Sequence, residues 1–212
     1  MLEKDSKLDP RARRTRQMLQ QSMNALMNEK SFTQITVQDI AARADVNRAT
    51  FYAHFVDKYD LINSIIRDHF QAMLDEVLPE NAMMTCKNLN LLIQSVYAYL
   101  SNFPGQCNSA QLHKDHGLMV QQVQYQMYVV LLEWLKHAPS RNKTEVIPDD
   151  NETTLLEVSA MMISWSIFGP ILQTAWGKRK ISSKQLTDQI MKLIQFSFSE
   201  YLVPDPASAS TR

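Results

Sequence analysis

The sequence has 212 residues, with 22 Lys plus Arg against 22 Asp plus Glu, so its formal net charge is zero when the histidines are neutral. A content of 45% hydrophobic and 21% charged residues excludes a disordered chain and is typical of a folded soluble protein of one or two domains. Zero net charge argues at first against a nucleic-acid partner, because binding to a polyanion uses surplus Lys and Arg.

The first nine residues mix charges without periodicity and predict a disordered arm. An amphipathic helix is predicted over residues 11–29, where apolar side chains recur at the spacing of one helical face. These side chains are Leu19, Met23, Leu26 and Met27.

Two short helices are predicted next, over residues 36–44 and 48–55. Thr36 and Asp39 form a T-x-x-D start signal for the first, and Asn47 can cap the second. Asp45 lies in the turn between them and tolerates a left-handed backbone better than most residues. The side chains expected to face inward are Val37, Ile40, Ala41, Ala44, Phe51 and Phe55.

Asp57 precedes a long predicted helix over residues 58–78. Its expected buried side chains are Leu61, Ile65, Ile66, Met73, Leu74 and Val77. Further helices are predicted over residues 88–103, 118–137, 152–177 and 182–202, with an irregular stretch before Gly117 and a disordered tail over 204–212. Because no convincing strand is present, the predicted fold is all-α.

The predicted helix over residues 152–177 contains 20 consecutive uncharged residues, 158–177, which is long enough to span a membrane. Eight of these positions are Ser, Thr, Gln, Gly or Pro, which argues against a membrane span. We expect a helix that is buried on several sides or lies in a subunit interface. Pro170 in its middle predicts a kink, because proline removes one backbone hydrogen bond.

The two short helices have the proportions of a helix-turn-helix, whose second helix enters the DNA major groove. The residues left facing outward on that helix are Arg48, Ala49, Thr50, Tyr52, Ala53 and His54. A guanidinium suits guanine edges, small side chains allow close approach, and hydroxyl and imidazole groups suit phosphate oxygens.

Three motifs in this region follow one another at a defined spacing: T-V-x-D-I-A at residues 36–41, T-F-Y-x-H-F at 50–55 and D-K-x-x-L at 57–61. Residues 13–61 resemble the DNA-binding signature of the TetR/AcrR family of bacterial regulators. The resemblance implies a three-helix helix-turn-helix DNA-binding domain at the N-terminus, followed by a larger helical domain for effector binding and dimerisation. The domains expected are an arm (1–9), the DNA-binding domain (10–58), the helical domain (59–203) and a tail (204–212).

The same resemblance implies a homodimeric repressor that binds a palindromic operator in double-stranded DNA and leaves it when a small apolar or amphipathic molecule binds. The dimer would form through the last two helices. The residues implied to contact DNA are Arg13, Arg14, Thr36, Gln38, Asn47, Arg48, Ala49, Thr50, Tyr52, His54 and Lys58. Asp45 departs from the pattern, since the family usually has glycine there.

Methionines and aromatic residues are frequent in the C-terminal part, where they can line an adaptable apolar pocket. Candidate effector-binding residues are Tyr97, Met119, Tyr128, Met162 and Trp165. For each of them singly, ordinary core packing is the simpler interpretation. An alternative function is a DNA-bound adaptor whose helical domain binds a protein rather than a small molecule.

Catalytic and metal sites are not expected. His113, Asp115 and His116 could approach one metal ion, but no further ligand is evident. No Ser/His/Asp or Cys/His arrangement stands out, so we predict neither an enzyme nor a cofactor.

The spacing of the glycines and cysteines argues against nucleotide-binding and redox sites. The four glycines have no GxG or GxxxxG spacing, which excludes a P-loop or Rossmann nucleotide site. Cys86 and Cys107 form no CxxC motif, and no secretory signal opens the sequence. We therefore expect reduced thiols and a cytoplasmic location, with a disulfide or redox-sensing pair as the alternative.

The zero net charge conceals an uneven distribution. Residues 1–9 carry a net charge of −1, residues 10–58 carry +4 and residues 59–212 carry −3. The positive segment coincides with the predicted helix-turn-helix, so the charge pattern is consistent with a nucleic-acid partner. It predicts a salt-sensitive affinity with few phosphate contacts per subunit.

Overall fold

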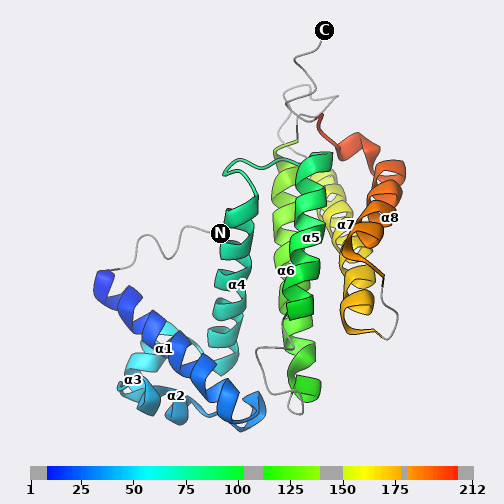
Figure 1. The fold of residues 1–212 in the computed structure, drawn as a ribbon. Helices are drawn as coiled ribbons and strands as arrows, with labels where there is room; N and C mark the ends of the chain where they lie inside the picture. The colour runs from blue at the N-terminus through cyan, green and yellow to red at the C-terminus, as the bar shows by residue number, and fades with distance from the viewer. Residues whose placement is uncertain (1–8, 103–111, 139–149, 178–180, 205–212) are drawn as a thin grey trace. The chain divides into compact units, whose positions relative to one another are not determined.

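The computed structural model describes residues 9–102, 112–138, 150–177 and 181–204, and the chain is helical through most of these ranges (Figure 1). The helices are α1 (Pro10–Glu29), η1 (Phe32–Gln34), α2 (Val37–Arg43), α3 (Arg48–His54), α4 (Lys58–Val77), α5 (Cys86–Asn102), α6 (Leu112–Lys136), α7 (Asp150–Trp176), α8 (Ser183–Ser197) and η3 (Ser199–Tyr201). Within the described ranges, the strand-like pairing is an isolated bridge between Thr85 and Val203. The predicted all-α fold is therefore confirmed.

The chain forms two compact units. Unit 1 comprises Met1–His69 and Pro104–Gln122, and unit 2 comprises Phe70–Phe103 and Val123–Arg212. The long helices α4 and α6 each contribute residues to both units. The functional domain boundaries expected from the sequence stay a prediction.

Unit 1 has a core formed by one face of each of its helices. Val37, which was expected to face inward, is only half-buried because it is the first residue of α2 and follows the exposed Thr36. The other inward positions predicted for α2 and α3 are buried as expected. The buried apolar side chains include Leu19, Met23, Leu26, Phe32, Ile35, Ile40, Ala41, Ala44, Phe51, Phe55 and Leu61.

Side chains at the helix starts determine where α2 and α3 begin. Thr36 Oγ1 accepts a hydrogen bond from the Asp39 N–H at 3.1 Å, and Asp39 Oδ2 accepts one from the Thr36 N–H at 2.8 Å, forming a capping box. Asn47 Oδ1 accepts a hydrogen bond from the Thr50 N–H at 2.7 Å. Both predicted helix starts are confirmed. Asp45, in the turn between them, has a φ of 53°, which confirms the left-handed conformation expected there.

Unit 2 is organised around α5, which packs against α7 and α8. The buried apolar side chains of these helices include Leu89, Leu92, Ile93, Val96 and Leu100 of α5, Ile163, Ile167, Phe168 and Ile171 of α7, and Leu186, Ile190 and Ile194 of α8. Two side-chain hydrogen bonds also join the helices: Trp176 Nε1 donates to the Leu100 carbonyl at 3.1 Å, and Gln124 Nε2 donates to Ser164 Oγ at 3.0 Å.

Three details of the helical predictions are wrong. Helix α6 begins at Leu112 rather than at residue 118, because Gly117 lies inside the helix instead of before it. The last predicted helix ends early, since α8 stops at Ser197 and the separate turn η3 follows. Val77 is 38% exposed rather than buried, because it is the last residue of α4 before the turn that contains Pro79.

Helix α7 is apolar on two opposite faces. Its inner face packs in unit 2, while Leu155, Val158, Met161, Met162 and Trp165 are each about half exposed on the outer face. Thr153–Trp176 is long and apolar enough to cross a membrane by length and composition, and 39% of its most apolar window is buried within the protein. Burial of the inner face agrees with the expectation of a helix packed on more than one side.

Replacement of Asp45 by glycine is expected to stabilise the protein. A Cβ atom in the left-handed region is unfavourable, and glycine removes it, so after the added freedom of the unfolded chain we expect a gain of about 0.5–1 kcal/mol in the free energy of unfolding. Urea denaturation of Asp45→Gly, Asp45→Asn and Asp45→Val checks this. Asn should be nearly neutral and Val destabilising; equal stability of Gly and Val would contradict the explanation.

Candidate nucleic-acid interface

The outer face of α3 presents a small group of exposed side chains near its N-terminus. Phe51 and Phe55 are 0% and 2% exposed, so they fix which face of α3 points into unit 1. Arg48, Ala49 and Tyr52 are exposed on the other side. Because Asn47 caps α3, the first turn of the helix that carries these side chains is stabilised.

Arg48 and Tyr52 contact each other along this outer face. Arg48 Nη2 donates a hydrogen bond to the Tyr52 hydroxyl at 3.3 Å, and Arg48 Cζ lies 5.9 Å from the Tyr52 ring centroid. The contact restricts the arginine side chain to fewer conformations while leaving its remaining N–H groups available. Such an arginine can donate two parallel hydrogen bonds to the edge of a guanine.

Thr36 and Asn47 serve as helix caps in the structure, and Thr50 is bonded to the second of them. The Thr50 hydroxyl donates to Asn47 Oδ1 at 3.0 Å, and the Thr36 hydroxyl donates to Asp39 Oδ2 at 2.7 Å. Each hydroxyl has a single proton, so neither threonine can also donate to a phosphate oxygen in this arrangement. Their predicted contacts with DNA stay predictions. Gln38 is exposed on α2, as a base contact would require.

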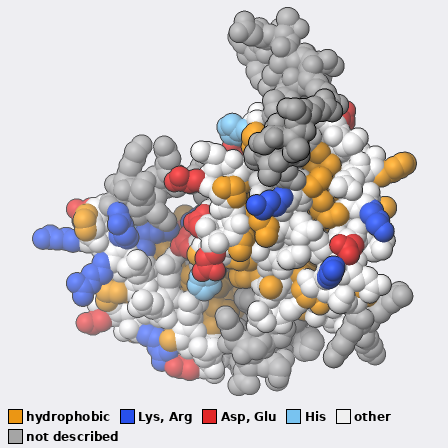
Figure 2. Space-filling view, turned by 45° about the horizontal axis from the view of Figure 1, so that its top comes forward, with side chains coloured by type: hydrophobic (Ala, Val, Ile, Leu, Met, Phe, Trp, Pro, Cys, Tyr) orange, Lys and Arg blue, Asp and Glu red, His pale blue; other side chains and the backbone are white. Residues whose placement is uncertain are grey.

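Half of the cations in residues 10–58 are engaged within the protein. Arg16 Nη1 donates to the His54 carbonyl, Lys30 pairs with Asp39 at 2.8 Å, Arg43 pairs with Glu29 at 2.6 Å, and Lys58 donates to three backbone carbonyls. Within the described residues, no ion pair involves the remaining four, which are Arg11, Arg13, Arg14 and Arg48. Figure 2 shows Lys and Arg side chains gathered at the left of the view, at the end of the chain that contains α1–α3.

The imidazole of His54 is held in its neutral form. Burial lowers the pKa of His54 below its ordinary value, and the positive charge of Arg16 lowers this pKa further. At neutral pH His54 can therefore offer a phosphate an N–H donor but no positive charge. The guanidinium of Arg16 also lies 4.4 Å from the Phe55 ring centroid, so it stabilises the C-terminal end of α3 from within unit 1.

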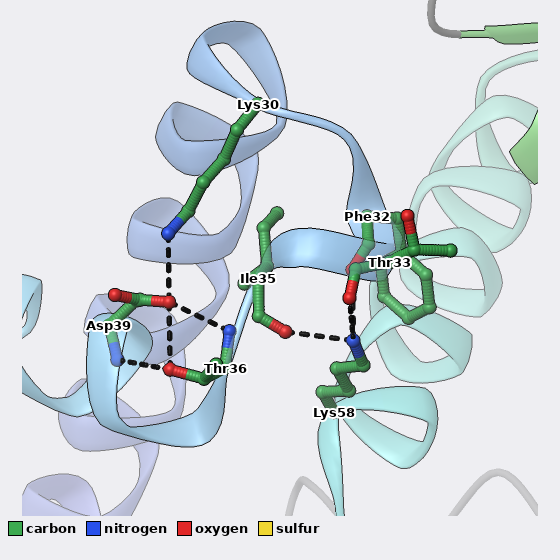
Figure 3. A network of polar contacts seen from close by, with 7 residues as sticks. All are labelled: Lys30, Phe32, Thr33, Ile35, Thr36, Asp39 and Lys58. Carbon is green, nitrogen blue, oxygen red and sulfur yellow. Dashed lines mark hydrogen bonds and ion pairs between the residues drawn. The ribbon is translucent and has the colours of Figure 1, made fainter.

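Asp39 is the centre of the polar network at the start of α2 (Figure 3). Its Oδ2 atom accepts from the Lys30 ammonium and from both the N–H and the hydroxyl of Thr36. These contacts, with Lys30 the strongest, hold the pKa of Asp39 well below its usual range. The capping box follows from the sequence, but the ion pair with Lys30 does not, because no local pattern links Asp39 to a residue nine positions earlier, beyond the end of α1.

Comparison with known proteins supports this interpretation of unit 1. Residues 24–65 match the family described as bacterial regulatory proteins, tetR family, and this range contains α2, α3 and the start of α4. Within that range the chain has the DNA-binding domain of the TetR family. The HTH-type transcriptional regulator YxbF of Bacillus subtilis (strain 168) is 28% identical over 105 residues, a stretch that covers 48% of this chain and 28% of YxbF.

The similarity to solved structures extends over both units of the chain. A transcriptional regulator from Pseudomonas aeruginosa PAO1 aligns with a TM-score of 0.53 at 16% identity, covering 92% of this chain and 94% of that one. RolR in complex with resorcinol aligns with a TM-score of 0.52 at 16% identity, covering 90% and 92%. At such low identity the likeness concerns the fold alone.

The candidate effector residues lie in different environments. Tyr97 and Tyr128 are half-buried, whereas Met162 and Trp165 are 56% and 50% exposed on the outer face of α7. The side chain of Met119 lies outside the described residues. Burial raises the pKa of Tyr128, and the negative charge of Glu157 raises it further, so the phenol stays protonated. A pocket that contains all five residues stays a prediction.

No group of three metal-ligating side chains is found among the described residues. The side chains of His113, Asp115 and His116 lie outside that part of the chain, as does Cys107. Cys86 is a free, half-buried thiol whose sulfur accepts a hydrogen bond from Gln195 Nε2 at 3.3 Å.

Replacement of Asp39 by asparagine is expected to lower stability in a pH-dependent way. Because the pKa of Asp39 is lower in the folded than in the unfolded state, its stabilising effect is fully present above the unfolded pKa of about 4 and is lost progressively as pH falls from there toward the folded pKa. Asp39→Asn should therefore lower the melting temperature by about 2–4 °C at pH 7, the size of a lost helix cap. The difference from the wild type should shrink between pH 5 and pH 3; a constant difference would contradict the assigned charge effect.

Proposed function

We propose that this TetR-family chain is a homodimeric transcriptional repressor that binds a palindromic operator and is released from it by a small apolar or amphipathic effector. The observation that carries the proposal is the exposed first turn of α3. Arg48 and Ala49 stand outward there, with Tyr52 exposed in the next turn, on a helix that Asn47 caps and that Phe51 fixes in unit 1. In a helix-turn-helix, this turn is the one that contacts base edges in the major groove.

In the proposed complex, Arg48 donates to a guanine edge, while Ala49 allows close approach and Gln38 contacts a neighbouring base from α2. Arg13 and Arg14, which are exposed on the first turns of α1, bind phosphates. Phosphate contacts position the domain without selecting a sequence, whereas the contact of Arg48 provides selectivity. The small number of unpaired cations predicts a modest salt dependence for each subunit.

A second copy of the chain is the proposed occupant of the outer face of α7. Five large apolar side chains are exposed along this face, and Leu193 and Phe196 of α8 are exposed by 68% and 89%. A soluble monomer rarely exposes such a continuous apolar surface, and a symmetric dimer buries it in both subunits at once. A dimer also supplies two α3 helices, which must be separated by about 34–36 Å to bind adjacent major grooves.

The proposed effector is a small molecule. The structurally similar RolR is bound to resorcinol, which supports a small-molecule ligand for a domain of this fold. Tyr97 and Tyr128 of unit 2 are the proposed pocket residues, and we assign Met162 and Trp165 to the dimer surface because of their exposure. The proposed location is the cytoplasm, where the DNA is.

Arg48→Ala is expected to abolish most sequence selectivity. Loss of one bidentate contact to guanine costs about 1–3 kcal/mol in each half-site, so operator affinity should fall at least about 10-fold while affinity for unrelated DNA changes little. Fluorescence anisotropy with a duplex selected by the wild-type protein from a random library measures both. Arg43→Ala is the matched control, because Arg43 is paired with Glu29. Unchanged selectivity of Arg48→Ala would remove the basis of the proposal.

Met162→Lys is expected to break the dimer. A lysine buried without a partner in an apolar interface costs about 3–5 kcal/mol, so the dimer dissociation constant should rise by at least about 100-fold. Sedimentation equilibrium measures it, with Val56→Lys as the control, because Val56 is an apolar residue of unit 1 that is 80% exposed. A monomeric wild-type protein would instead favour the adaptor function, in which a different protein covers the face of α7.

A further inference from the structure

The ammonium group of Lys58 is fully occupied by the protein backbone. Lys58 Nζ donates to the carbonyl oxygens of Phe32 at 2.9 Å, Thr33 at 3.2 Å and Ile35 at 2.8 Å (Figure 3). We call these three oxygens the carbonyl site. A lysine ammonium has three N–H donors and no acceptor, so each donor has one partner here.

The carbonyl site is electrostatically suited to a cation. Its three oxygens belong to η1 and to Ile35, the residue that follows it, and a backbone carbonyl oxygen carries partial negative charge. The Phe32 carbonyl also accepts a hydrogen bond from the Ile35 N–H at 3.2 Å. The ammonium also lies 4.8 Å from the Phe32 ring centroid and 5.7 Å from that of Tyr59, and these rings meet edge to face at 5.1 Å. The negative faces of aromatic rings attract a cation in the same way.

Lys58 occupies an unfavourable position in its own helix, for which its contacts with the carbonyl site compensate. Lys58 is the first residue of α4, and the N-terminus of a helix carries partial positive charge, which disfavours a lysine there. The carbonyl site compensates for this unfavourable position. The same three contacts leave no N–H of Lys58 for a phosphate oxygen.

The carbonyl site and Lys58 lie at the two ends of the helix-turn-helix. Ile35 is the residue before the cap of α2, and Lys58 follows the loop after α3, so residues 36–57 are enclosed between them. We propose that Lys58 is a positioning residue, which fixes α2 and α3 relative to the first turn of α4 and does not contact DNA phosphates. The inference rests on the proposed DNA binding for its functional consequence, but its structural basis is independent of DNA.

The salt dependence of operator binding tests this role. Each phosphate contact contributes about 0.9 to the slope of log affinity against log salt, or about 1.8 for both subunits of a dimer. Lys58→Met should weaken operator binding at least about 10-fold with an unchanged slope. Arg14→Gln, which removes an exposed cation, is the matched control and should reduce the slope by about 1.8.

The variant Lys58→Arg further distinguishes a positioning role of Lys58 from a phosphate contact. Arginine keeps the positive charge and can bind a phosphate, but its planar guanidinium does not reproduce three donors that diverge from one small ammonium. We therefore expect Lys58→Arg to lose as much affinity as Lys58→Met. Wild-type affinity for Lys58→Arg, together with a reduced slope for Lys58→Met, would show a phosphate contact and overturn the inference.

Hydrogen exchange without DNA keeps the inference testable even if the proposed function fails. In the free protein, both Lys58 variants should exchange the amide protons of α2 and α3 at least about 10-fold faster, while those of α5 in unit 2 remain unchanged. Unchanged protection of α2 and α3 in both variants would overturn the positioning role. Failure of the wild-type protein to bind any selected duplex would contradict the proposed function and leave this result unaffected.

Discussion

The short segment between α1 and α2 is the constraint on which the binding surface depends. Helices of seven residues, such as α2 and α3, are not stable alone, so their positions must come from contacts with their surroundings. The carboxylate of Asp39 ties the start of α2 to Lys30 after the end of α1, and the ammonium of Lys58 ties the preceding carbonyls to α4. Arg16 then holds the last carbonyl of α3.

These contacts reduce the number of positive charges in residues 10–58 that are available to bind DNA. This segment contains eight Lys and Arg residues. If net charge alone determined DNA binding, all eight would be available to bind phosphates. Four of them instead stabilise the domain through carbonyl and carboxylate partners. The cations that remain are on the first turns of α1 and at the start of α3, so the charge available to DNA is smaller and more localised than the sequence indicates.

The sequence predicted those features that depend on neighbours along the chain. Thr36 with Asp39 and Asn47 with Thr50 are three residues apart, so their caps follow from helical geometry, as does the left-handed turn at Asp45. The partners of Arg16 and Lys58 lie 38 and 23 to 26 residues away and became evident only from the folded chain. The fold class could be predicted because it depends on such local patterns. The roles of individual cations could not be predicted, because their partners are distant in the sequence.

Helix α7 illustrates the same limit with apolar residues. Its uncharged sequence indicated burial on more than one side but could not assign side chains to each partner, because the apolar residues show almost no one-sided periodicity. In the structure Ile163 and Ile167 are buried, while Met162 and Trp165 are exposed. A side chain on the outer face is covered only by another molecule. The exposure of Met162 and Trp165 therefore separates them from the half-buried Tyr97 and Tyr128, a difference that composition alone did not reveal.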